Sequence, residues 1–326
     1  LSIRRQRQMC IRDSYSPKKA IFFPGQGAQS VGMAKELCEE CPAAKEMFDK
    51  ASAVLGYDLL DVCVNGPAER LNSTAVSQPA IYVSSLAALE AMKMTDEGKA
   101  AIDAVDVAAG LSLGEYTALT FAGALTFEDG LKLVKIRGES MQEAADATPS
   151  GMASVIGLSA DKAEELAARA AAESGAPVSV ANYLCNGNYA VSGAIPAIDK
   201  VEEIAKPEFK ARMVVRLAVA GAFHTDFMAP AADKLKAALD ATPIQATRIP
   251  VVSNVDVKPH SDADSIRATL AKQLTNPVQW ETSMTMLLEK GLESATEVGP
   301  GKVISGIMKR VDKKFPCDNF FGQEAK

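Results

Sequence analysis

The chain has 326 residues, of which 48% are hydrophobic, and this length allows one large domain or two smaller ones. Its net charge of −6 argues against nucleic acid or a membrane surface as a partner, and no apolar run reaches the roughly 20 residues that span a bilayer. We therefore expect a globular protein that binds neither nucleic acid nor membranes.

Residues 1–16 carry four arginines, one acid and no hydrophobic periodicity. Such a segment is typical of an Arg-rich transit peptide or of a cloning artefact, so we expect it to be disordered or non-native. Six scattered cysteines indicate a reducing compartment. Cys38 and Cys41 have the spacing of a redox pair, but no strand leads into them, so a redox role is not expected. A zinc site is not expected either, because the chain has no second Cys-x-x-Cys pair and only two histidines.

Strands alternate with helices over residues 17–149. The expected elements are a strand at Ala20–Phe23, a helix at Ala80–Met92 with Pro79 in its first turn, a strand at Ala104–Ala109, and helices at Glu115–Phe121 and Phe127–Ala145. This alternation favours a parallel sheet that is covered by helices on both faces.

Between residues 150 and 218 the predicted order changes to βαββαβ, which is that of a ferredoxin-like unit. The expected strands are Met152–Leu158, Pro177–Asn182, Tyr189–Ser192 and Arg212–Ala218, and the helices are Ala160–Ser174 and Pro196–Ala205. Further on we expect strands at Pro250–Ser253 and Ala295–Val298, and helices at Ser265–Gln273 and Val303–Val311. We therefore predict a large α/β domain over 17–149 and 219–315, an inserted small domain over 150–218, and a C-terminal tail over 316–326.

The strongest local motif is Gly110-Leu111-Ser112-Leu113-Gly114, which lies between a predicted strand and a predicted helix. This is the context of a nucleophile elbow, where side chains two residues on either side of the serine would collide. The serine then stands at a helix N-terminus, where backbone N–H groups stabilise negative charge. The motif predicts Ser112 as a nucleophile, the alternative being a glycine-bracketed turn with a capping serine.

A serine nucleophile needs a base, and the chain offers only His224 and His260. His224 directly follows an apolar strand, so we predict that it is the base. His260 lies in a polar stretch and is expected to be a solvated loop residue. The loop Pro24-Gly25-Gln26-Gly27 matches neither a P-loop nor a dinucleotide fingerprint. We expect it to supply one oxyanion N–H, with that of Leu113 as the other.

Six motifs in order resemble the malonyl-CoA:acyl carrier protein transacylase family of fatty-acid synthesis, over Lys18 to Val311. They are Phe23-Pro24-Gly25-Gln26-Gly27-Ala28-Gln29, Gly110-Leu111-Ser112-Leu113-Gly114-Glu115-Tyr116, Ile136-Arg137-Gly138, Ala222-Phe223-His224, Asn276-Pro277-Val278 and Gly299-Pro300-Gly301-Lys302. Leu111 stands where many bacterial members have His. Leu at this position, and the segment Asn182-Tyr183-Leu184-Cys185, resemble the plant and algal plastid forms of the family.

The resemblance implies a fold with a large hydrolase-like α/β domain and a small ferredoxin-like one. It also implies roles for individual residues. Ser112 would be the nucleophile, His224 its base, the N–H groups of Gln26 and Leu113 the oxyanion hole, Arg137 the partner of the malonyl carboxylate, and Gln273 the residue that orients His224 through a carbonyl. Asn182 and Phe223 would contact substrate, with Phe223 disfavouring an α-methyl branch.

The implied reaction is ping-pong transfer of malonyl from malonyl-CoA, through Ser112, to the phosphopantetheine thiol of acyl carrier protein. We expect no metal or bound cofactor, a monomer, and a location in the plastid stroma or, alternatively, the bacterial cytoplasm. The alternatives are a serine hydrolase or thioesterase on the same elbow, an acyltransferase domain excised from a polyketide synthase, and a non-catalytic binding protein that has kept the fold.

Overall fold

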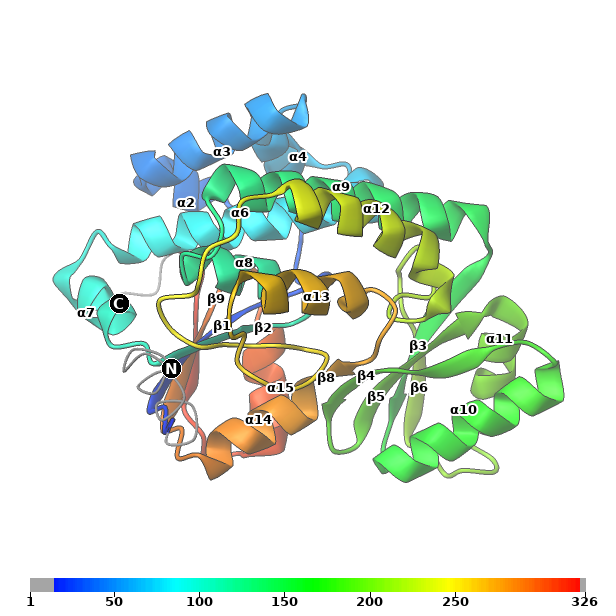
Figure 1. Cartoon of the computed structure of the whole chain (residues 1–326). Helices are drawn as coiled ribbons and strands as arrows, with labels where there is room; N and C mark the ends of the chain where they lie inside the picture. The colour runs from blue at the N-terminus through cyan, green and yellow to red at the C-terminus, as the bar shows by residue number, and fades with distance from the viewer. Residues whose placement is uncertain (1–14, 323–326) are drawn as a thin grey trace.

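The structure is a computed structural model that describes residues 15–322, and it is built around two sheets (Figure 1). The large sheet has the strand order β10-β9-β1-β2-β7, and each neighbouring pair is parallel, as predicted. Its strands are β1 (Lys19–Phe23), β2 (Val107–Gly110), β7 (Val251–Val252), β9 (Ser294–Val298) and β10 (Cys317–Phe320). None of the helices in this part of the chain is both long enough and apolar enough to cross a membrane.

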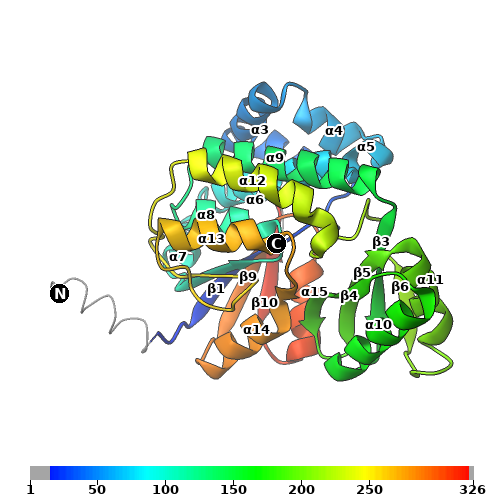
Figure 2. The ribbon, with the colours of Figure 1, turned by 45° about the vertical axis from the view of Figure 1, so that its right-hand side comes forward.

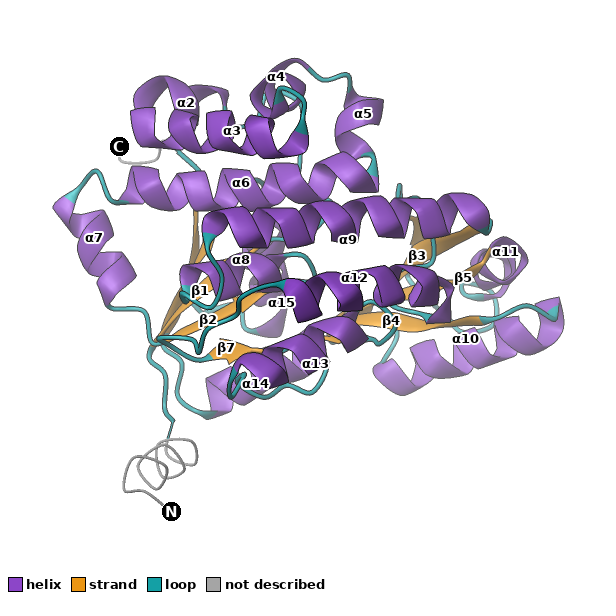
Figure 3. Cartoon of the chain, turned by 45° about the horizontal axis from the view of Figure 1, so that its top comes forward, coloured by secondary structure: helices purple, strands orange, loops and turns teal. Residues whose placement is uncertain are grey.

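Alternating side chains of β1 place a separate core on each face of the large sheet. Ile21 and Phe23 pack into the core formed with helices α3, α6, α8, α9, α12 and α13, whereas Phe22 packs against Trp280 on the opposite face. Figure 3 shows α6, α9 and α12 as neighbouring layers over the first face. The helices of the large region are α2 (Lys35–Glu40), α3 (Pro42–Leu55), α4 (Leu59–Asn65), α5 (Ala68–Asn72), α6 (Thr74–Met92), α7 (Asp96–Asp103), α8 (Gly114–Phe121), α9 (Phe127–Ala147), α12 (Ala229–Ala241), α13 (Ala263–Gln273), α14 (Trp280–Glu289) and α15 (Val303–Val311).

The second sheet has the order β6-β3-β5-β4-β8, and its first four strands have the predicted ferredoxin-like order (Figure 2). Its elements are β3 (Ser150–Ile156), α10 (Ala160–Ser174), β4 (Val178–Cys185), β5 (Asn188–Ala194), α11 (Ile195–Ile204), β6 (Met213–Arg216) and β8 (Val278–Gln279). Strand β8 comes from outside residues 150–218 and pairs in parallel with β4. The second sheet therefore includes a strand from the predicted large domain. The domain limits at residues 150 and 218 stay a prediction.

Several predicted element boundaries were wrong. The strand expected at Ala104–Ala109 is β2 at Val107–Gly110, because α7 continues to Asp103. Helix α6 begins at Thr74, so that Pro79 lies inside it and not in its first turn. The backbone N–H of Thr74 donates to the Gln142 side chain at 2.9 Å, and this cap comes from another helix, which a local pattern does not show. The expected tail contains strand β10, which pairs with β9 along the edge of the large sheet.

The expected disordered segment also ends earlier than predicted. Residues 1–14 lie outside the described residues, but Tyr15 and Ser16 contact the fold. The Tyr15 ring packs against the core on the α14 side, with the Lys290 ammonium 6.0 Å from the ring centroid. The Ser16 hydroxyl donates to the Lys290 carbonyl at 2.8 Å. The described fold therefore includes both residues.

Candidate active site

Ser112 lies in the turn between β2 and α8, and its φ of 52° is in the left-handed region. A Cβ added at Gly110 would overlap the backbone of Gly114, and one added at Gly114 would overlap the Phe23 carbonyl. The predicted need for glycine at both positions is confirmed. The tight turn holds the serine hydroxyl at the carboxyl end of the parallel sheet, before the N-terminus of α8.

His224 lies next to this serine, and it too has a positive φ, of 60°. Its Nε2 atom is 2.9 Å from Ser112 Oγ, and its Nδ1 atom is 2.8 Å from the Gln273 carbonyl oxygen. A carbonyl only accepts hydrogen bonds, so Nδ1 carries the proton and Nε2 accepts from the serine hydroxyl. The loop before His224 is fixed by the second sheet, because the Ser192 hydroxyl donates to the Phe223 carbonyl at 2.8 Å.

The environment of His224 keeps its imidazole neutral at neutral pH. Burial is the main cause, and the positive charge of Arg137 adds to it, so that the pKa of His224 falls to about 4. A neutral imidazole that accepts from a hydroxyl has the geometry and the charge state of a general base.

Arg137 is buried in α9 and reaches the same point. Its Nη2 atom donates to Ser112 Oγ at 2.9 Å and to Gln273 Oε1 at 3.0 Å, and its Nη1 atom donates to Gln78 Oε1 at 2.6 Å. The guanidinium carbon lies 5.4 Å from the Tyr116 ring centroid. Within residues 15–322 every acceptor bonded to this cation is neutral. Burying an unpaired charge is costly, so the site favours an anionic ligand.

A cavity of about 90 Å³ opens onto these groups. It is lined by Gly25, Gln26, Gln78, Leu111, Ser112, Arg137, Met141, Met152, Asn182, Leu217, Val219, Phe223 and His224. The cavity brings Gln26, Asn182 and Phe223 together with the predicted nucleophile, base and arginine. Gln273 does not line the cavity, but it is hydrogen-bonded to Arg137, His224 and Ser112. In the described structure the backbone N–H groups of Gln26 and Leu113 have no hydrogen-bond partner, which leaves both free for an oxyanion.

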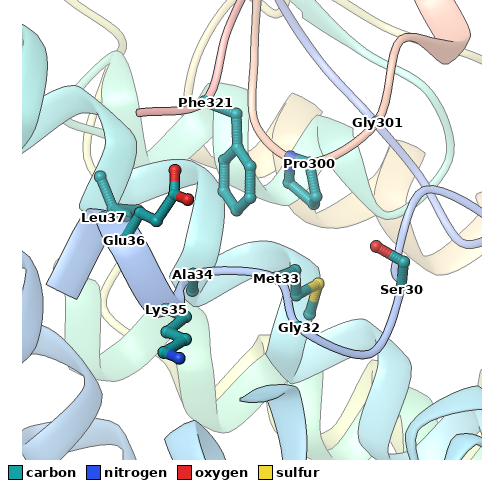
Figure 4. Close-up of a pocket in the computed structure, with 10 residues that line it drawn as sticks. All are labelled: Ser30, Gly32, Met33, Ala34, Lys35, Glu36, Leu37, Pro300, Gly301 and Phe321. Atoms are coloured by element: carbon teal, nitrogen blue, oxygen red, sulfur yellow. The ribbon is translucent and has the colours of Figure 1, made fainter. Parts of the chain in front are cut away.

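A larger hollow of about 330 Å³ lies elsewhere, between α2 and the loop before α15 (Figure 4). Figure 4 shows the Phe321 ring and Pro300 on one side of it and Lys35 on the other. It contains none of the predicted site residues, and its lining offers no nucleophile with a base. The smaller cavity, which contains the predicted nucleophile, base and arginine, is therefore the candidate active site.

Two predictions about other residues have different outcomes. His260 was predicted to be solvated, and this was wrong: it is buried, and its Nε2 atom is 2.8 Å from Glu115 Oε1. The buried carboxylate attracts the imidazole into the core, which a polar local sequence does not reveal. Cys38 and Cys41 are both free thiols, and burial raises the pKa of the Cys38 thiol to about 11, the opposite of a reactive redox cysteine.

The sequence pattern missed three buried polar residues around the site. They are Gln78, which holds Arg137, and Glu115 and Asn254, which lie behind the elbow. Asn254 could have been suspected, because it follows β7 at the carboxyl end of the parallel sheet, where sites form in such folds. Glu115 directly follows the glycine of the elbow motif, but nothing in the sequence shows which residues contact it.

Comparison with known proteins agrees with this geometry. The acyl transferase domain family matches residues 21–314. A malonyl CoA-acyl carrier protein transacylase of Bacillus subtilis is 40% identical over 297 residues, which cover 91% of each chain. The solved malonyl CoA-acyl carrier protein transacylase of Coxiella burnetii is 36% identical with a TM-score of 0.87, covering 94% of this chain and 95% of that one.

A third relative is a malonyl-transacylase solved in complex with a type II PKS acyl-carrier protein. It is 35% identical with a TM-score of 0.88, and the match covers 94% of this chain and 96% of that one. The family expected from the six motifs is thereby confirmed. The chain belongs to the acyl transferase domain family and, within it, to the malonyl CoA-acyl carrier protein transacylases.

Proposed function

We propose that this chain transfers malonyl from malonyl-CoA to the phosphopantetheine thiol of acyl carrier protein, with Ser112 carrying the malonyl group between them. The observation that supports this most is the buried Arg137 guanidinium, which donates to Ser112 Oγ at 2.9 Å and has no carboxylate partner among residues 15–322. A malonyl group on Ser112 carries a free carboxylate that would pair with it. A serine hydrolase with an uncharged acyl group would leave this cation unexplained.

In the first half of the reaction, Ser112 Oγ attacks the thioester carbonyl while His224 Nε2 accepts the hydroxyl proton. The carbonyl oxygen becomes negative, and the free N–H groups of Gln26 and Leu113 stabilise it. The carbon–sulfur bond then breaks, and the coenzyme A thiolate takes the proton from the imidazolium. The products are malonyl-Ser112 and free coenzyme A.

The second half runs through the same groups in reverse. The phosphopantetheine thiol gives its proton to His224 and attacks the ester carbonyl of malonyl-Ser112. Ser112 leaves as the alkoxide and regains its proton from His224, which restores the free enzyme. His224 is therefore base and then acid in each half, and its neutral state at neutral pH suits the start of both.

Two further residues would contact the acyl chain. Phe223 is buried beside His224 and lines the cavity, so its ring would oppose a methyl branch on the α-carbon of malonyl. Asn182 also lines the cavity, and its Oδ1 atom is buried without a partner among the described residues. A thioester substrate with amide N–H groups would satisfy this oxygen.

We also infer that the enzyme acts as a monomer and without a bound cofactor, because the chain itself supplies the nucleophile, base, cation and oxyanion donors. For location we propose the plastid stroma, on the strength of Leu111 and of Asn182-Tyr183-Leu184-Cys185, with the bacterial cytoplasm as the alternative. Sedimentation velocity measures the oligomeric state, and imaging of a tagged protein in its source cells measures the location.

Intact-mass measurement after brief exposure to malonyl-CoA tests the central proposal. We expect the protein to gain one malonyl group, to lose it when acyl carrier protein is added, and to gain none in the Ser112→Ala variant. Steady release of coenzyme A in the absence of any acceptor would instead indicate a hydrolase.

A further inference from the structure

Glu115 is a buried carboxylate that does not touch the reacting atoms, yet it contacts the residues that hold them. It lies in the first turn of α8, three residues after Ser112. Its Oε2 atom accepts from Gln273 Nε2 at 2.6 Å and from the Asn254 backbone N–H at 3.1 Å. Its Oε1 atom lies 2.8 Å from His260 Nε2. A buried carboxylate with three such partners is held in one position.

Through Gln273, this carboxylate determines which way an amide faces. Gln273 Nε2 lies against two groups that only accept, the Glu115 carboxylate and the Ser112 carbonyl at 3.1 Å. Its Oε1 atom is thereby turned toward Arg137, from which it accepts at 3.0 Å. The carbonyl of the same residue holds His224 Nδ1. Without Glu115 the Gln273 amide could rotate by half a turn. Its N–H groups would then face the N–H groups of Arg137, and the guanidinium would be repelled from its present position.

Through Asn254, the same carboxylate supports the strained turn of the nucleophile. Asn254 Oδ1 accepts from the Ser112 backbone N–H at 2.6 Å, and Asn254 Nδ2 donates to the Gly110 carbonyl at 2.8 Å. The side chain thus bridges the turn in which Ser112 has a positive φ. Glu115 fixes the backbone of Asn254, so it connects this bridge to Gln273.

We propose that Glu115 is a positioning residue, braced by His260, that fixes the Gln273 and Asn254 amides and thereby holds His224, Arg137 and Ser112 in reacting geometry. This inference rests on the proposed malonyl transfer. The proposal gives a role to the buried pair of Glu115 and His260, neither of which touches the reacting atoms.

The first test compares Glu115→Ala with a matched control, Glu297→Ala. Glu297 is also wholly buried and also accepts near a helix N-terminus, from the N–H groups of Ile304 and Ser305, but it has no contact with the site. The measurement is the rate of single-turnover malonylation. This rate is divided by the amount of protein that can form malonyl-enzyme, so that unfolded molecules do not lower it. We expect Glu115→Ala to lower this rate roughly 100-fold and to reduce the preference for malonyl-CoA over acetyl-CoA. Glu297→Ala should lower only the melting temperature.

A second pair of variants keeps the proposal testable if Glu115→Ala does not fold. His260→Leu removes the brace, whereas His260→Gln keeps a donor where Nε2 lies. We expect a loss of about tenfold in the per-molecule rate for His260→Leu, and recovery of most of it in His260→Gln. An unchanged rate and malonyl preference in Glu115→Ala, or in His260→Leu if the first variant is unfolded, would show that the pair is only structural. If the parent protein forms no malonyl-enzyme at all, the proposed function fails instead.

Discussion

Arg137 Nη2 lies 2.9 Å from Ser112 Oγ, so a buried cation and the predicted nucleophile are in direct hydrogen-bond contact. The same oxygen is 2.9 Å from His224 Nε2, and the hydroxyl can donate to that nitrogen while it accepts from the guanidinium. None of the described acidic residues is bonded to Arg137, so we expect this cation to pair with the carboxylate of the acyl group.

The Arg137→Ala variant should lose malonyl transfer selectively. Two hydrogen bonds to a charged group are together worth on the order of 3–5 kcal/mol, so the specificity constant for malonyl-CoA should fall by hundreds to thousands of fold. Acetyl-CoA leaves the arginine without a partner, so its transfer should hold or rise. Arg137→Lys should restore only part of the malonyl activity, because one ammonium does not reproduce the fork of a guanidinium.

The matched control for this variant is Arg248→Ala. That exposed arginine also lies over an aromatic ring, 4.5 Å from the Phe121 centroid, but it is not part of the cavity. Both substrates should react with it as with the parent protein. An equal loss of malonyl and acetyl transfer in Arg137→Ala would show that Arg137 is structural and would remove the main support for malonyl.

Ser112→Ala should abolish acyl-enzyme formation, because no other hydroxyl lies beside His224 Nε2 in the described structure. His224→Ala should keep the serine but slow its acylation by roughly two to four orders of magnitude, the usual scale of general-base loss. Single-turnover quench experiments with malonyl-CoA measure both. If His224→Ala acylates at the parent rate, another group must take the proton.

The acid limb of the acylation rate should lie near the pKa of His224, at about 4, and not near the ordinary histidine value of 6.5. Below that pKa the imidazole is protonated and can no longer accept the serine proton, so the rate falls as the pH falls through 4. Arg137→Met removes a charge that lowers this pKa, so the limb should move to higher pH. Acetyl-pantetheine is the appropriate substrate, since it has no ionisable group in this range. An unmoved limb in Arg137→Met would mean that the two charges do not interact.

Two glycine-to-alanine changes should have opposite effects on stability. Gly110→Ala would place a Cβ inside the backbone of Gly114, so it should lower the melting temperature and prevent acylation. Gly306 lies within α15, and a Cβ there meets nothing within 4 Å. Gly306→Ala should therefore stabilise the protein, by up to about 1 kcal/mol, with unchanged activity. Calorimetry and single-turnover malonylation of both variants measure this contrast.

The boundary of the N-terminal segment can be tested by truncation. A chain that begins at Pro17 loses the packing of the Tyr15 ring and the hydrogen bond from Ser16 to the Lys290 carbonyl, so it should melt several degrees below one that begins at Tyr15. Both should retain the parent rate of malonylation, because neither residue lines the cavity. Equal melting temperatures for the two chains would show that these contacts contribute nothing.

Much of the architecture and the family could be predicted from the sequence, because the signals are local. Periodic apolar residues indicated most of the strands and about half of the helices, and α10 and α15 have the predicted limits. The two glycines around Ser112 indicated a turn that admits no side chain. With only two histidines, the candidate base was narrowed to one by its place after a strand. The roles assigned to these residues stay predictions until the variants are measured.

Tertiary structure decided what depends on partners far apart in the chain. His260 has a polar local sequence, yet it is buried, because a carboxylate 145 positions earlier accepts from it in the core. Arg137 has the sequence of a surface helix residue, and only the packing of α9 against the elbow places its guanidinium on Ser112. Local sequence fixes backbone preferences, whereas the cost of a buried charge or an unsatisfied amide depends on every element packed around it.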